Sequence, residues 1–118
     1  MSTDIALEKM LQISTDALLK KMAKDIVTLH VGSIAPITDY FVLASCSNKS
    51  QMDAAIDGVE EEMKNAGFIL KAREGGSDGG WVLLDYVDII IHIFSTEMRD
   101  FYALDSTWRD VEKKTYVD

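Results

Sequence analysis

Hydrophobic positions recur along this chain with two periods, one typical of helices and one typical of strands. Helical spacing predicts helices over residues 3–22, over a stretch that starts near residue 48 and ends before Gly67, and over a short stretch that starts at Ser95 or Thr96. Short runs rich in β-branched and aromatic residues predict the strands, which are 25–31, 39–45, 68–72, 81–85 and 88–94.

The order of these elements predicts the fold class. Thr3 is a plausible cap of the first helix, and either Asn48 with Gln51 or Ser50 with Asp53 can cap the second. The alternation α-β-β-α-β-β-β-α predicts an α/β protein with a mixed β-sheet of about five strands covered by helices.

The length of 118 residues suits one domain, 1–118, with a C-terminal tail from about residue 109. No apolar run is long enough to cross a bilayer, and the first residues resemble neither a secretory signal nor a transit peptide. We therefore expect no membrane contact and a cytoplasmic location.

The charge balance narrows the class of partner. Twenty acidic residues against 12 basic ones give a net charge of −8, which repels nucleic-acid phosphates. We expect little direct nucleic-acid contact and a basic protein as partner. A single cysteine and two histidines give no familiar zinc spacing, and we expect no cofactor.

The glycine-rich stretch REGGSDGGW, residues 73–81, invites comparison with phosphate-binding loops. It matches neither GxxxxGK[ST] nor GxGxxG, and a strand follows it where a phosphate-binding loop needs a helix. The stretch is better interpreted as a flexible connection between strands.

Paired carboxylates are the second candidate for chemistry. Nucleotidyltransferases combine a Gly-Ser turn, here Gly76-Ser77, with two carboxylates that share a pair of metal ions. Asp85 and Asp88 are three positions apart, so a continuous strand would direct them to opposite faces. The pattern instead favours a two-residue hairpin turn at Tyr86-Val87, flanked by both aspartates.

His92 and Cys46 are single reactive residues without a catalytic context in the sequence. His92 lies between two isoleucines of an apolar strand, which favours a structural or interfacial role over that of a general base. Cys46 follows a strand and approaches a helix start, yet no cysteine motif surrounds it. We expect it to be a small buried residue.

Aromatic residues are the more informative candidates. Tyr86, Phe94, Phe101, Tyr102 and Trp108 fall close to Trp81 in the predicted elements, and Trp and Tyr are enriched at binding hot spots. For Phe94 and Phe101 core packing is the better interpretation. Trp81, at a junction of loop and strand, is expected to be exposed.

These motifs together resemble one known family. The segments ITDYFVLAS, W-VLLDYVD-IIIHIF and R-FYALDSTW, with Gln51 between the first two, look like the ribosomal silencing factor family, also called the Iojap family. The resemblance runs from about Asp25 to Trp108, and its motif residues fall in the family's order and spacing.

The resemblance implies a nucleotidyltransferase-like fold without catalytic carboxylates, and therefore a translation regulator that is not an enzyme. The family binds the free large ribosomal subunit through its fourteenth ribosomal protein and blocks joining of the small subunit, which represses translation when nutrients are scarce. The matched residues that would form or support the docking surface are Trp81, Asp85, Tyr86, His92, Phe94, Arg99 and Tyr102. The sequence does not separate residues that touch the partner from those that hold the strands.

The chain departs from the family pattern at a few positions. Val87 stands where relatives usually have glycine, and a β-branched residue resists positive φ, which puts a type I′ turn in doubt. His30, Cys46 and Asp105 replace a usual Asp, Gly and Glu.

Two other functions fit the sequence. One is a small nucleotidyltransferase that uses Gly76, Ser77, Asp85 and Asp88. The other is a homodimeric adaptor that uses the same apolar strand surface with a second copy.

Overall fold

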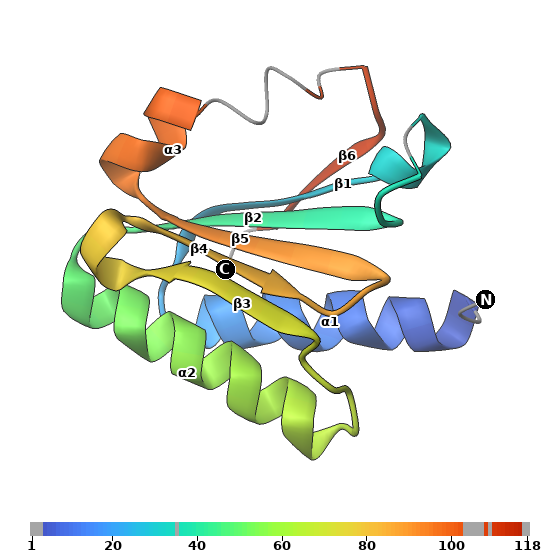
Figure 1. Cartoon of the computed structure of the whole chain (residues 1–118), viewed down its shortest axis with the longest axis horizontal. Helices are drawn as coiled ribbons and strands as arrows, with labels where there is room; N and C mark the ends of the chain where they lie inside the picture. Colours follow the sequence, from blue (N-terminus) through green and yellow to red (C-terminus); the bar gives the residue numbers. More distant parts are fainter. Residues whose placement is uncertain (1–3, 35, 103–107, 109, 117–118) are drawn as a thin grey trace.

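The computed structural model describes residues 4–34, 36–102, 108 and 110–116, which form a six-stranded sheet between helices (Figure 1). Helices α1 (Asp4–Lys20) and α2 (Lys49–Asn65) pack side by side on one face, and the short α3 (Thr96–Tyr102) lies on the other. The strands are β1 (Lys24–Leu29), β2 (Tyr40–Cys46), β3 (Ala72–Gly76), β4 (Trp81–Asp85), β5 (Ile89–Ser95) and β6 (Lys113–Tyr116).

The predicted α/β class with a mixed sheet is confirmed. The strands lie in the order β3-β4-β5-β2-β1-β6. The pair β2 and β5 is parallel, because α2 and the β3–β4 hairpin lie between these strands in the chain, and all other neighbours are antiparallel. The expected cap Thr3 and Asp105 lie outside the described residues, as does the side chain of Phe101.

The predicted strand over 68–72 was placed too early. Phe68 and Leu70 pack against the helix-side core without strand pairing, and β3 instead begins at Ala72 and uses the glycines of the loop. Gly75 has φ 75°, and a Cβ there would collide with the carbonyl oxygen of Trp81. Only glycine allows this approach of β3 to β4. Part of the presumed flexible connection is therefore strand.

Strand β6 was not predicted, because its sequence, KKTY, has no apolar alternation. It is an edge strand that pairs antiparallel with β1, with Leu29 opposite Lys113 and Ile26 opposite Tyr116. Backbone hydrogen bonds define such a strand, and exposed lysines are common on sheet edges. The segment described as a tail thus contributes the sixth strand.

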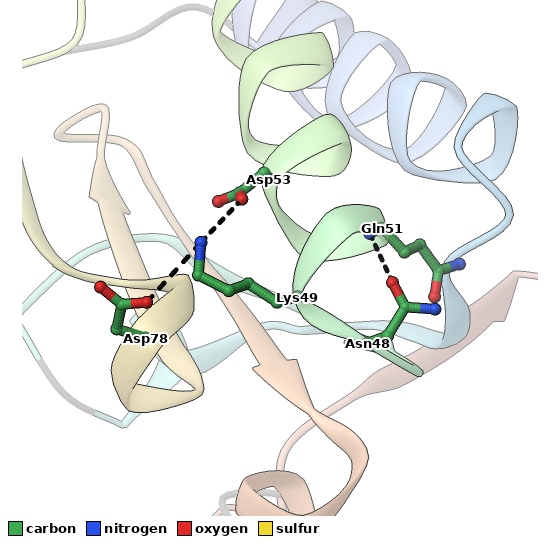
Figure 2. A network of polar contacts seen from close by, with 5 residues as sticks. All are labelled: Asn48, Lys49, Gln51, Asp53 and Asp78. Atoms are coloured by element: carbon green, nitrogen blue, oxygen red, sulfur yellow. Dashed lines mark hydrogen bonds and ion pairs between the residues drawn. The ribbon is translucent and has the colours of Figure 1, made fainter.

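Of the two expected caps of α2, the structure has Asn48 with Gln51 and not Ser50 with Asp53. The Asn48 side chain accepts a hydrogen bond from the Gln51 backbone N–H at 2.8 Å, as Figure 2 shows. Gln51 in turn accepts from the Ser47 backbone N–H and donates to the carbonyl oxygens of Lys21 and Met22. These bonds fix the start of α2 against the end of α1.

A lysine links the start of α2 to the glycine-rich turn. Lys49 Nζ lies 3.3 Å from the Asp53 carboxylate and 3.6 Å from that of Asp78, which belongs to a short 3-10 turn, Ser77–Gly79 (Figure 2). A hydrogen bond from Ser77 is the largest cause that lowers the pKa of Asp53, followed by Lys49. The glycine turn is therefore held by contacts of its own polar residues.

The sheet has a separate apolar core on each face. On the helix side, Ile89, Ile91 and Ile93 of β5 are buried beneath α1 and α2. On the opposite side, Ile90, His92 and Phe94 alternate with them and are also buried. Burial on both faces explains why β5 is almost entirely apolar.

The turn between β4 and β5 carries a strained residue. Val87 has φ 73°, so the left-handed conformation that its branched side chain was expected to resist is adopted. The turn is one residue later than predicted, because Tyr86 N–H bonds to the Ile89 carbonyl and leaves Val87 and Asp88 at the tip. The Asp85 carboxylate accepts from Val87 N–H at 2.8 Å and holds this conformation.

We expect Val87→Gly to stabilise the protein. The valine side chain is 55% exposed, so its removal loses little burial, whereas glycine adopts positive φ without strain. After the entropy cost of glycine, the free energy of unfolding should rise by about 1 kcal/mol. Thermal unfolding checks this, with Val87→Ala as control. An unchanged or lower melting temperature for the glycine variant would contradict strain at this turn.

Candidate functional site

The sheet face opposite α1 and α2 carries a cluster of rings that we call the aromatic face: Phe41, Trp81, His92, Phe94 and Trp108. Antiparallel pairing places Trp81 of β4 opposite Phe94 of β5, and their rings stack with centroids 5.3 Å apart. Phe94 is fully buried, whereas Trp81 is partly exposed. Trp81 thus presents a surface on a fixed aromatic base.

A hydrogen bond fixes the orientation of Trp81. Its indole Nε1–H donates to Nδ1 of His92 at 3.1 Å. Because Nδ1 accepts, the neutral His92 ring carries its proton on Nε2, and this buried atom has no hydrogen-bond partner among the described residues. Burial lowers the pKa of His92 to about 4. A neutral histidine therefore holds the tryptophan at physiological pH.

Phe41 and Trp108 complete the aromatic face. The sequence indicated Trp108 as one of the aromatic candidates near Trp81 but not as part of the docking surface, and it did not indicate Phe41 as a site residue. The ring of Phe41, in β2, makes T-shaped contacts with the rings of His92 and Trp108, with centroids 4.7 Å and 5.4 Å apart. The signal for Phe41 was available, because it occupies the same face of its strand as Leu43, next to His92 in the parallel register. The position of Trp108 depends on the chain folding back over the sheet.

Arg99 joins α3 to the sheet. It is almost fully buried, and its guanidinium donates to the Ser45 hydroxyl at 3.0 Å, at the end of β2. The bond holds α3 on the sheet. Met98, the residue before Arg99, packs against the same core cluster as Trp81. Tyr102 is the last residue of α3, and its side chain lies outside the described part of the chain.

Asp85 and Tyr86 lie away from the aromatic cluster. Asp85 is at the far end of β4 from Trp81, where its carboxylate holds the β4–β5 turn. Tyr86 is buried on the helix side of the sheet and lines a pocket of about 500 Å³ with Glu60, Lys64 and Ile69 among others. Burial, and then the charge of Glu60, raise the pKa of Tyr86 to about 12. Asp85 and Tyr86 are therefore not part of the aromatic face.

Cys46 and the metal-binding side-chain types were the remaining candidates for chemistry. Cys46 is buried at the end of β2, and this burial raises the pKa of its thiol to about 11. In the described parts of the chain, no group of three or more His, Cys, Asp and Glu side chains is arranged to hold a metal ion. No helix in these parts is long and apolar enough to cross a membrane.

The glycine turn differs in geometry from a phosphate-binding loop. The residues after Gly80 form β4, and the Gly80 carbonyl accepts from Ser95 N–H at 2.8 Å. A Cβ at Gly80 would lie within 3 Å of Ser95 Oγ and Met98 Cγ, so this glycine permits close packing of the turn on α3. The fold and the site define a single-sheet α/β domain with two helices on one face and an aromatic cluster on the other.

Comparison with known proteins supplies the family. The model of the family "Ribosomal silencing factor during starvation" matches residues 4–118. A ribosomal silencing factor RsfS from Zymomonas mobilis is 37% identical over 86% of this chain and 76% of its own length. The relative from Halalkalibacterium halodurans is 28% identical, with 87% and 88% covered. A more distant mouse relative, "Mitochondrial assembly of ribosomal large subunit protein 1", is 28% identical over 77% of this chain and 41% of its own length.

Solved structures share the fold. A crystal structure of a protein from Chromobacterium violaceum superimposes with a TM-score of 0.84 at 24% identity, covering 95% of this chain and 93% of that one. The chain belongs to the ribosomal silencing factor family, whose name describes a role in silencing ribosomes during starvation.

Proposed function

We propose that this protein binds the large ribosomal subunit through its fourteenth ribosomal protein and blocks joining of the small subunit, so that translation is repressed under nutrient limitation. The observation that carries the proposal is the partly exposed Trp81 on its fixed aromatic base, in a chain that belongs to the silencing-factor family. An exposed tryptophan held by packed neighbours is typical of a protein-binding hot spot.

Charge and the names of relatives support the same kind of partner. The net charge of −8 opposes binding to ribosomal RNA and favours a basic ribosomal protein. The name of the mouse relative ties that protein to assembly of a large ribosomal subunit. By this kinship we propose the large subunit as the partner here, and the cytoplasm as the compartment.

The geometry suggests which matched residues make the contact. Trp81 has accessible surface, whereas His92, Phe94 and Arg99 are nearly or fully buried and orient their neighbours. In our proposal Trp81 touches the ribosomal protein and these three support it. Asp85 and Tyr86 act in the fold of the β4–β5 turn. The mechanism is steric exclusion, which requires affinity and position and no catalytic step.

A subunit-joining assay tests the proposal. Purified large subunits are preincubated with the protein, small subunits are added, and light scattering follows association. We expect joining to be suppressed in proportion to occupancy, and an excess of small subunits should not restore it rapidly. The control preincubates the small subunit instead, and this order should delay joining less. Unaltered joining with a folded protein that binds the large subunit would contradict steric exclusion.

A homodimer through the same face is the competing arrangement for the free protein. If the aromatic face binds a second copy, light scattering of the free protein will show a mass that rises with concentration, and Trp81→Ala will lower it. Dimerisation would then compete with subunit binding. At high protein concentration, inhibition of joining would rise by less than in proportion to the protein added.

A further inference from the structure

Exposed aliphatic side chains gather at the end of the sheet farthest from Trp81. Ile34 and Ile37, in the connection between β1 and β2, are 63% and 60% exposed, and Val87, at the tip of the β4–β5 turn, is 55% exposed. Ile37 and Val87 line one hollow of about 280 Å³ together with Pro36. Clustered exposed aliphatics mark interaction surfaces more often than scattered ones do.

The two segments that form this hollow are joined by hydrogen bonds. The Thr38 hydroxyl donates to the Val87 carbonyl at 2.8 Å, and the Asp39 N–H donates to the Asp88 carbonyl at 3.1 Å. The hollow is therefore a formed feature of the fold. We call four of its lining residues, Ile37, Asp39, Val87 and Asp88, the turn patch.

The Val87 side chain does not stabilise the fold. Its positive φ costs stability, and its exposed side chain gains little from burial. Backbone strain of this kind persists where a side chain has a function. A branched aliphatic side chain held at the tip of a turn, beside a second exposed aliphatic residue, is suited to packing against another molecule.

The charge of the turn patch indicates what kind of molecule it would bind. Asp39 and Asp88 both line the hollow, and none of the ion pairs between described residues involves either of them. No basic side chain is among the lining residues. The hollow thus combines aliphatic walls with two carboxylates, within a chain of net charge −8.

We propose that the turn patch binds an arginine-bearing aliphatic segment of a basic protein. The alkyl part of an arginine can pack on Ile37 and Val87 while its guanidinium reaches Asp39 and Asp88. Guanidinium and carboxylate form short, charge-assisted hydrogen bonds, and arginine is the side chain that best matches paired acceptors. Nucleic acid does not fit, because its phosphates would meet the carboxylates.

This surface is separate from the aromatic face. Trp81 pairs with Phe94 at one end of the β4–β5 hairpin, and the turn patch lies at the other end. The four steps from Trp81 to Asp85 along β4 span roughly 13 Å at the usual rise per residue, and the turn patch lies beyond Asp85. The inference therefore stands independently of the subunit-joining proposal, and Trp81→Ala should leave the turn patch unaffected.

The test uses a short synthetic peptide in which arginine alternates with leucine, titrated into the isotope-labelled full chain and followed by amide NMR shifts. We expect shifts to concentrate on Ile37, Asp39, Val87 and Asp88. Val87→Gly should weaken peptide binding about tenfold, the effect of one lost aliphatic contact, even though it stabilises the fold. Asp88→Asn should also weaken binding about tenfold.

Matched controls separate this site from general attraction. Asp57→Asn removes the same charge from the exposed side of α2, and Ile69→Ala removes an exposed isoleucine elsewhere, so neither should change the affinity. A peptide with glutamate in place of arginine, or glycine in place of leucine, should not bind. The inference is overturned if Asp57→Asn weakens binding as much as Asp88→Asn, if the shifts lie on other acidic surfaces, or if the peptide does not bind at millimolar concentration.

Discussion

Replacing Trp81 with alanine should weaken binding to the large ribosomal subunit by about 30-fold or more, the range of a hot-spot aromatic residue. The indole stacks on buried Phe94 and is oriented by its hydrogen bond to His92, so its exposed surface is presented in one fixed position. Little conformational freedom is then lost when a partner binds. Co-sedimentation of the protein with purified large subunits over a concentration series measures the effect.

Controls for Trp81→Ala separate binding from folding. The substitution removes packing from Phe94 and a hydrogen bond from His92, so the free energy of unfolding should fall by about 2–3 kcal/mol. Circular dichroism must show that the variant is folded at the assay temperature. Trp81→Phe keeps a stacked ring and should retain more affinity. Ile5→Ala changes an exposed residue of α1, on the other side of the sheet, and should have no effect. Undiminished binding by folded Trp81→Ala would refute the proposed contact.

Acid should destabilise the protein through His92. Burial lowers the pKa of this histidine from 6.5 to about 4 in the folded state. The unfolded chain therefore binds the extra proton first as pH falls, so stability is fully present above pH 6.5 and is lost as pH falls towards 4. Because the folded state favours the neutral ring, His92 contributes at most about 3 kcal/mol to the free energy of unfolding, and this contribution is lost between pH 6.5 and pH 4. Urea unfolding at several pH values measures it.

His92→Asn is the matched variant for this experiment. The asparagine oxygen can accept the hydrogen bond from Trp81, but the side chain does not titrate. Other titrating groups contribute equally to both proteins, so the difference between the two stability curves isolates His92. We expect the curves to converge as pH falls from 6.5 to 4. Parallel curves would show that His92 titrates normally and that its burial has no such effect.

Most elements of the fold were predictable because they follow side-chain patterns. The helical spacing in residues 3–22 and the apolar run 88–94 predicted α1 and β5 to within two residues at each end. The errors at β3 and β6 have one physical cause. β3 and β6 are defined by backbone hydrogen bonds to a neighbouring strand, and neither the glycines of β3 nor the lysines of β6 carry the apolar pattern that reveals a strand.

The sequence predicted which residues belong to the candidate site better than it predicted how they are arranged into a surface. Trp81, His92 and Phe94 were all named for the docking surface, and the structure places them together because the hairpin pairs their strands. Tyr86 belongs to the helix-side core, since consecutive strand residues point to opposite faces and Tyr86 follows Asp85. The bond of Arg99 to Ser45, 54 residues away in the chain, depends on where α3 meets the sheet.

The sequence by itself determined the α/β class, the family and the acidic character that favours a basic partner. These properties depend on local periodicity, motif spacing and composition, which are present in the unfolded chain. The tertiary structure alone decided that Trp81 is partly exposed while His92 and Phe94 are buried beneath it, and that Val87 shares a hollow with Ile37. Such relations depend on strand register and on contacts between segments far apart in sequence, which local patterns do not encode.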